Sequence, residues 1–573
     1  MENNREKKIG WIFLCILFLF SLYYIIYSNV RMIELPHLTW FDQMELAELY
    51  FEGDLELYDL FSTYGEHGML ANNIIFLINI ALFHGTTMFD VVINDINVIV
   101  CASILMSYTL KTLKKRNNIV VFLIMEGIFL FSSTQASSGA METQVRLGLL
   151  FFLIAMLAVD RELRNKEIKV KGLVLGTVLI LLSINVFGTL YSFAGVPLIW
   201  GICLFYFIKR EKSVNHRKNA LISGLYFLTI PLYLVEYRLL WNGTLSQMGT
   251  ENGTSFNLVE IIKCLFAWCA NGVLGWAYHE SLDYKSITFL VVGAIVFLIV
   301  LLSVMLFMKA RMYEKTWLPL MCITYSFGVF VMIIIGRAPG WDWMANEWYN
   351  VHIKIALASS VWIYGYVFQI SQKRIVWIIL PMILFGCSVV GNVYEIKRAP
   401  YVRQYYEEKQ KYLFVEDKLD MPVDINGQTP LLHSLDKTMD SLDILRKYNL
   451  SVFRYWDVYE AYQEVMSKFS KVIYLDGHYE DGWVENEISF IYNSENSTQI
   501  DITYHSLEKQ TLKIWVNGEF KQTNEITKGT GKISVEIESG KSSHILITSD
   551  YYEQLSFPDD RYASYIISDI IGK

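Results

Sequence analysis

Charged residues are scarce in this chain. They make up 18% of its 573 residues, whereas hydrophobic residues make up 53% and aromatic residues 15%. Soluble proteins carry about 25% charged residues, and aromatic side chains gather where helices meet a membrane interface. The composition therefore indicates a membrane protein and excludes disordered and collagen-like chains. The net charge of −8 also excludes an ordinary basic nucleic-acid-binding protein.

Cysteine is sparse too, and none occurs after Cys387. All seven cysteines lie in or beside apolar stretches, and no Cys-x-x-Cys pair is present. This pattern excludes a disulfide framework and a cysteine-based zinc site. We interpret the cysteines as small buried hydrophobic residues.

The acidic residues are concentrated in the last third of the chain. From residue 394 onward there are 20 Lys and Arg against 30 Asp and Glu, whereas the preceding residues have 29 against 27. This shift predicts a membrane body over residues 1–393 and a water-exposed part after it. Residues 394–470 have helical patterns and form a predicted connector. Residues 471–573 contain short alternating strands, with a strong hairpin signal at Asn517-Gly518. The predicted fold is an α-helical polytopic membrane protein with an extracytoplasmic α+β domain that ends in a β-sandwich.

Basic clusters mark the cytoplasmic loops of membrane proteins. The apolar segments between such clusters give about eleven helices, each long enough to span a bilayer. They are expected near 11–30, 90–110, 118–136, 146–160, 172–191, 193–208, 219–240, 286–308, 316–336, 351–370 and 375–393. The odd number predicts a multi-pass cell-membrane protein with a cytoplasmic N-terminus and an extracytoplasmic C-terminal domain. We expect the first helix to be retained, because no small-residue cleavage site follows it.

Two apolar stretches, 69–83 and 258–277, are left over by this assignment. Both would begin and end on the outer side, so we predict interfacial or re-entrant helices there. The alternative is two more full spans.

The first outer loop, residues 31–89, contains no Lys or Arg after Arg31 but many acidic residues. Most of these acids suit the solvated faces of short amphipathic helices. Asp42 differs, because it follows Trp40 and Phe41 just outside the first helix. A carboxylate that aromatic side chains partly desolvate is a candidate general base.

Several short motifs resemble those of bacterial polytopic membrane glycosyltransferases of the GT-C superfamily. In the first outer loop they are Phe41-Asp42-Gln43, Gly53-Asp54-Leu55 and Tyr64-Gly65-Glu66-His67-Gly68. Further along are Phe131-Ser132-Ser133-Thr134-Gln135 with Gln144, and Asp481-Gly482-Trp483 and Asp560-Arg561 in the tail. The resemblance is scattered over most of the chain, and each motif is short.

The resemblance implies an inverting transfer of a sugar from a polyprenyl-phosphate donor to an extracytoplasmic glycan or lipid acceptor. Asp42 matches the acid of the first loop and is the expected base. Glu66 would position the acceptor or, with Asp42, hold a divalent cation such as Mg or Mn. The residues expected to bind acceptor or substrate are Gln43, Gln135, Gln144 and Trp341.

A phosphate leaving group requires positive charge, and the expected donor-phosphate residues are Arg337, His67 and Lys354. Relatives often carry Gly-Arg, as at Gly336-Arg337, followed shortly by Arg-Tyr. This chain has Glu347-Trp348-Tyr349 instead, so the second basic residue is missing. His352 or Lys354 is the expected substitute, with Arg146 and Arg238 as weaker candidates.

Two other functions stay open. One is a transporter or flippase for a lipid-linked glycan, and the other is a non-catalytic assembly protein that binds polysaccharide. Asp95 and Glu126 are acids within predicted spans, where ionisable groups are usually functional. There is no chain of such acids and no symmetry between two halves, which favours an enzyme over a transporter. Asp560-Arg561 is expected to form a buried salt bridge within the C-terminal domain.

Overall fold

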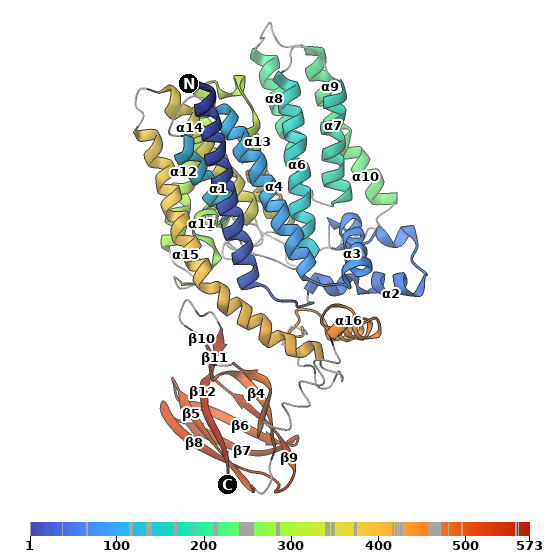
Figure 1. Cartoon of the computed structure of the whole chain (residues 1–573), viewed down its shortest axis with the longest axis vertical. Helices are drawn as coiled ribbons and strands as arrows, with labels where there is room; N and C mark the ends of the chain where they lie inside the picture. Colours follow the sequence, from blue (N-terminus) through green and yellow to red (C-terminus); the bar gives the residue numbers. More distant parts are fainter. Residues whose placement is uncertain are drawn as a thin grey trace. The chain divides into compact units, whose positions relative to one another are not determined.

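The chain folds into two compact units (Figure 1). The first comprises Met1–Met32 and Asp42–Ala399, and the second comprises Ile33–Phe41 and Pro400–Lys573. A short segment near the N-terminus thus folds with the C-terminal part, which the sequence did not predict. The computed structural model describes residues 2–36, 38–64, 67–113, 119–132, 140–164, 170–187, 190–209, 216–239, 257–281, 287–337, 344, 350–371, 375–414, 418, 421, 423, 428–455, 471–479, 481–493, 497–555, 559 and 561–573.

The first unit is a bundle of apolar helices. Among the described residues, nine helices are long and apolar enough to cross a membrane, since a span needs about 20 residues at a rise of 1.5 Å each. They are centred on α1 (Glu2–Arg31), α4 (Met88–Thr112), α6 (Ala140–Arg164), α8 (Gly195–Lys209), α11 (Leu258–Ser281), α12 (Ile287–Lys309), α13 (Leu318–Arg337), α14 (Asn350–Ile370) and α15 (Val376–Gln410). The prediction of a multi-pass helical membrane protein is confirmed. The side on which each terminus lies stays a prediction.

The remaining predicted spans correspond to shorter helices. These are α5 (Ile119–Leu130), α7 (Val170–Leu181), and the pair α9 (His216–Phe227) and α10 (Thr229–Leu239). In the first outer loop, α2 (Met44–Glu52) and α3 (Leu70–Phe83) follow one another. With 14 residues, α3 is too short to cross a bilayer upright, so its predicted interfacial position stays a prediction.

The helix over residues 258–277 has the length and apolarity of the alternative prediction, a full span. The Leu258–Gly275 part of α11 is long and apolar enough to span a membrane, and the helix packs against α12 and α14. Cys264, Trp268 and Cys269 are at most 1% exposed. The distribution of basic clusters, which marked the other spans, gave no signal for this helix because no such cluster flanks it.

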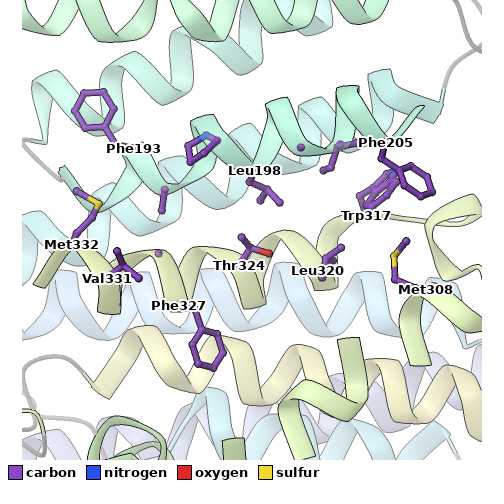
Figure 2. A pocket seen from close by; sticks show the side chains of 15 residues that line it. Phe193, Leu198, Phe205, Met308, Trp317, Leu320, Thr324, Phe327, Val331 and Met332 are labelled. Atoms are coloured by element: carbon purple, nitrogen blue, oxygen red, sulfur yellow. The ribbon is translucent and has the colours of Figure 1, made fainter. Parts of the chain in front are cut away.

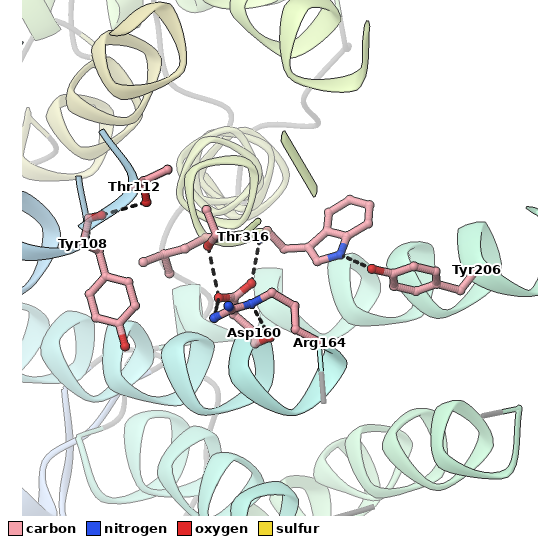
Figure 3. Close-up of polar contacts among 8 residues, drawn as sticks. Tyr108, Thr112, Asp160, Arg164, Tyr206 and Thr316 are labelled. Atoms are coloured by element: carbon pink, nitrogen blue, oxygen red, sulfur yellow. Dashed lines mark hydrogen bonds and ion pairs between the residues drawn. The ribbon is translucent and has the colours of Figure 1, made fainter. Parts of the chain in front are cut away.

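A buried carboxylate fixes the start of α13 (Figure 3). Asp160 of α6 accepts hydrogen bonds from the Trp317 backbone nitrogen at 2.6 Å, from Thr316 Oγ1 at 3.0 Å and from Arg164 at 2.8 Å. The first N–H groups of a helix lack partners within it, so Asp160 caps α13 from a neighbouring helix. Trp317 Nε1 also donates to Tyr206 at 2.7 Å, which ties α8 to the same point.

Asp160→Ala should destabilise the protein by roughly 2–4 kcal/mol, because the buried donors of Trp317 and Thr316 would lose their acceptor. Thermal unfolding in detergent measures this effect. Arg161→Ala, a change at the exposed neighbouring position, is the control and should leave the midpoint nearly unchanged. Equal midpoints for both variants would contradict the capping role.

The second unit contains α16 (Leu435–Lys447) and a sheet of eight strands. Neighbouring strands are antiparallel in the order β7-β6-β9-β4-β12-β5-β8, and β3 pairs with β4. The strands are β3 (Val472–His478), β4 (Trp483–Asn493), β5 (Gln499–Ser506), β6 (Gln510–Val516), β7 (Glu519–Ile526), β8 (Gly529–Glu536), β9 (Ser542–Ser549) and β12 (Tyr565–Gly572). The predicted C-terminal strand domain is confirmed.

The strands form one continuous sheet that curves on itself, in place of the two separate sheets of a β-sandwich (Figure 1). Gln522 of β7 donates to the Ser534 carbonyl of β8 at 2.9 Å. The two ends of the strand order therefore meet through a side chain, as in a nearly closed barrel. The β6–β7 hairpin turns at Asn517 and Gly518, whose φ angles of 52° and 80° are typical of the predicted tight turn.

Arg561 is the buried cation of the second unit. Its guanidinium bonds Asp559 and Asp481, the latter at 3.2 and 2.5 Å, and lies 4.5 Å from the Tyr479 ring centre. The predicted salt bridge of Arg561 is thus formed with these two acids, and Asp560 lies outside the described residues. Burial alone would raise the pKa of Asp481, but hydrogen bonds and charge from Arg561 outweigh it and hold that pKa below its usual value.

A pKa lowered by folding stabilises the folded state above the unfolded-state pKa, and this contribution disappears as the pH falls through the folded-state pKa. Arg561→Gln should therefore destabilise the second unit at pH 7. The difference in the free energy of unfolding between this variant and the wild type should become smaller below about pH 4. Calorimetric scans across pH test this. Lys541→Gln removes an exposed ion pair and is the control. If the difference in unfolding free energy between Arg561→Gln and the wild type stays constant from pH 7 to pH 3, Arg561 does not lower the pKa of Asp481.

Candidate functional site

Asp42 lies half-buried in the short 3-10 helix η1 (Leu38–Gln43) at the start of the first loop. The next residue, Gln43, is 2% exposed, and its Nε2 donates to Asn73 Oδ1 at 2.9 Å. Asn73 in turn donates to Ser62 Oγ at 2.8 Å and to the Leu60 carbonyl at 3.0 Å. These bonds hold the backbone after Asp42 against the first turn of α3.

Gln144 joins α6 to the same loop. It is 1% exposed, and its Nε2 donates to the Gly68 carbonyl at 2.8 Å. Within the described part of the chain, Oε1 of Gln43 and Oε1 of Gln144 are buried acceptors without a hydrogen-bond donor. Because a buried acceptor without a donor is costly, both atoms are suited to a ligand hydroxyl or a water molecule.

A second group of polar residues lies at the C-terminal end of α1 and in the middle of α15. The Arg31 side chain is 2% exposed; it donates to Tyr27 Oη at 2.9 Å and lies 3.8 Å from the Glu395 carboxylate. The Glu395 side chain is 4% exposed. The last residue of α1 is thus paired with a residue of the last helix of the bundle.

Arg146 and Asp95 lie in the second turns of α6 and α4, and each is 6% exposed. Arg146 donates to Tyr24 Oη at 3.4 Å, and Asp95 accepts from Ser28 Oγ at 2.8 Å. The two charged side chains also interact electrostatically. Both therefore face α1, close to its C-terminal end.

Lys354 of α14 stands between these groups. It is 5% exposed and lines two small cavities. One cavity, of about 10 Å³, is also lined by Glu395 and Asn392. The other, of about 30 Å³, is also lined by Arg146 and Asn97. The smaller is about the size that admits one water molecule, so the cations are gathered around space that a small polar group can enter.

Of the predicted donor-phosphate residues, the structure places Lys354 in this cluster. Arg337 ends α13 and His67 lies in the two-residue strand β2 (His67–Gly68), but their side chains are outside the described residues. Glu66, Gln135 and Trp341 also lie outside them. Among the residues the structure describes, no three His, Cys, Asp or Glu side chains gather as a metal site; the Asp42–Glu66 cation site stays a prediction.

His352, the other predicted substitute, faces elsewhere. It is fully buried, lies 3.2 Å from Tyr325 Oη through Nδ1, and packs edge-on against the Tyr191 ring. Glu126 is also buried and accepts a hydrogen bond from Thr109 at 2.9 Å. Arg31 and Glu395 were missed as site residues. In the sequence, the only indication of such a role for Arg31 and Glu395 was that each directly follows an apolar run.

An apolar groove of about 850 Å³ lies between α8 and α13 (Figure 2). Phe193 and Met332 lie at one end, and Phe205, Trp317 and Met308 at the other. A groove of this composition suits a hydrocarbon chain. It lies on the face of α13 that carries Thr324, Phe327, Gly328 and Val331.

No protein-family profile matches the chain, and no curated protein matches it. Two crystal structures of ArnT from Cupriavidus metallidurans are similar to it. The structure bound to undecaprenyl phosphate is 13% identical, with 81% of each chain covered and a TM-score of 0.40. The apo structure is 14% identical, with 77% of this chain and 75% of that chain covered and a TM-score of 0.40. Similarity at this level does not define a reaction or a substrate.

Glu395→Leu should destabilise the first unit by roughly 3–5 kcal/mol, because it leaves Arg31 as a buried charge without its acid. The double variant Arg31→Met/Glu395→Leu should recover part of this loss, as thermal unfolding in detergent would show. Glu407→Leu breaks an exposed pair on the same helix and should have little effect. A double variant as unstable as the sum of both single changes would contradict a direct pairing.

Proposed function

We propose that the chain is a GT-C-like membrane glycosyltransferase. It moves a sugar from a polyprenyl-phosphate-linked donor to an extracytoplasmic glycan or lipid acceptor, with inversion. The proposal is based mainly on two buried cations, Arg146 and Lys354, which line one cavity. Gln144, two residues before Arg146 on the same helix, contacts the loop that carries Asp42. A cation pair and a candidate base thus belong to neighbouring elements.

The cations suit the leaving group. Breaking the bond between the anomeric carbon and the phosphate oxygen leaves negative charge on the phosphate, and fixed positive groups in a water-poor site stabilise such charge strongly. Lys354 and Arg146 are the proposed phosphate-binding pair, with Arg337 at the end of α13 as a third candidate. Asp95 and Glu395 reduce the net charge of the cluster when no donor is bound.

Asp42 is the proposed base. It takes the proton of the acceptor hydroxyl while that oxygen attacks the anomeric carbon from the face opposite the phosphate. The glycosidic bond forms as the carbon–phosphate oxygen bond breaks, and polyprenyl phosphate leaves. Gln43 and Gln144 would accept hydrogen bonds from sugar hydroxyls through their buried Oε1 atoms.

The groove between α8 and α13 is the proposed place for part of the prenyl chain. Met332 lies at one end of the groove, and Arg337 follows it by five residues on α13, a rise of about 7 Å. A chain in the groove would then have its phosphate near the helix end that carries Arg337. This arrangement supports a lipid-linked donor in preference to a soluble one.

Lys354→Met should reduce transfer at least about 100-fold by removing a phosphate contact, and Asp42→Asn should do the same by removing the base. The measurement compares surface glycans and lipid-linked sugars of cells with the wild-type chain, a deletion and each variant. Loss of one sugar with accumulation of its lipid-linked donor is expected.

Lys263→Met, a change in an exposed ion pair of α11, is the matched control and should behave as wild type. Loss of the sugar in the deletion alone, with correctly inserted variants fully active, would contradict this site. That outcome would favour a transporter of lipid-linked glycan or a polysaccharide-binding assembly protein.

A further inference from the structure

The segment Ile33–Phe41 leads directly into Asp42 yet folds with the C-terminal unit. It connects the end of α1 to the first loop. Three of its described residues are buried, with Leu35 2%, Trp40 1% and Phe41 0% exposed. A connecting segment of this kind usually runs over the surface. Its burial means that residues far away in the sequence determine its position.

Polar contacts hold the beginning of this segment. Ser451 Oγ donates to Glu34 Oε1 at 2.8 Å, and Gln410 Nε2 donates to the Glu34 carbonyl at 3.1 Å. A hydroxyl–carboxylate bond of this length is charge-assisted and stronger than a neutral one. Glu34 is therefore bound through both its side chain and its backbone.

The end of the segment is held by the helix α16 and the turn before it. The Phe41 carbonyl accepts a long hydrogen bond from Ser441 Oγ at 3.4 Å, and the Phe41 ring meets His433 edge-on with centroids 6.5 Å apart. The Phe41 carbonyl belongs to the same planar peptide group as the Asp42 nitrogen and Cα. A bond to this carbonyl therefore restrains the peptide group that leads into Asp42.

Ser451 has an unusual backbone. Its φ of 52° lies in the left-handed region, which is uncommon for a residue other than glycine. Such conformations cost free energy and persist where surrounding contacts enforce them, often beside functional sites. Here the conformation accompanies a side chain that is bonded to Glu34 and a residue that is 3% exposed.

We propose that Ser451 and Ser441 are positioning residues for Asp42. Through Glu34 and the Phe41 carbonyl, the C-terminal unit holds Ile33–Phe41 and so sets the backbone of the residue that begins the catalytic loop. This inference rests on the proposed function of Asp42. It assigns to the C-terminal unit a part in the reaction, since a ligand or partner that shifts α16 would also alter the base.

Ser451→Ala and Ser441→Ala in the full chain test the proposal by steady-state transfer kinetics. We expect kcat to fall about 10-fold or more for Ser451→Ala, because small misplacements of a catalytic group have effects of this size or larger. The KM for the lipid-linked donor should stay unchanged, because Arg146 and Lys354 are intact. Ser451→Thr keeps a hydroxyl and should restore most of kcat. Ser568→Ala, at an exposed strand position, is the control.

Hydrogen exchange of residues 33–43 gives a readout that does not depend on activity. Exchange should be faster in Ser451→Ala and Ser441→Ala than in the wild type or Ser568→Ala. Unchanged exchange in this segment, or an unchanged kcat despite faster exchange, would overturn the positioning role. If the wild-type chain transfers no sugar, the proposed function fails instead, and the exchange result separately decides whether the serines hold the segment.

Discussion

Charge buried in an apolar helix bundle is stable only when other charges or hydrogen-bonding groups accompany it. In this chain the constraint applies to Arg31, Arg146 and Lys354, each at most 6% exposed. Arg31 lies 3.8 Å from Glu395 of α15, and Arg146 donates to Tyr24 of α1. These contacts join α1 to α15 and to α6. Lys354 lines two small cavities, of about 10 and 30 Å³. In the proposed function, the side chains packed around them would also bind the phosphate.

The first outer loop carries the proposed base, Asp42. Its position is determined by amide side chains that reach across the fold, from Gln43 to Asn73 and from Gln144 to Gly68. The segment before Asp42 is held by the C-terminal unit instead. A catalytic group placed between two anchored peptide groups would keep a defined orientation although it lies in a loop. Under the proposed function, the acidic tail would then contribute to the position of the base.

Hydropathy and basic flanks predicted most of the helices, because length and apolarity are local properties of the sequence. Helix α11 could not be assigned as a span from charge because it has no basic flanks. The curved sheet was not foreseen because strand order depends on distant pairing, as of β12 between β4 and β5. Lys354 was predicted as a phosphate-binding residue because the motif lacks its second basic residue. Arg31 and Glu395 were not predicted to lie together, since each resembles a charge at a membrane surface and only the fold brings them into contact.

In the proposed reaction, buried cations receive the phosphate of a lipid-linked sugar that is then transferred. The most direct measurement supplies a radiolabelled polyprenyl-phosphate hexose to liposomes containing the purified chain and acceptor from membranes of a deletion strain. We expect a labelled glycoside and an equal amount of free polyprenyl phosphate, and we expect Lys354→Met to abolish both. Movement of the intact labelled lipid between leaflets, with no new glycosidic bond, would contradict it.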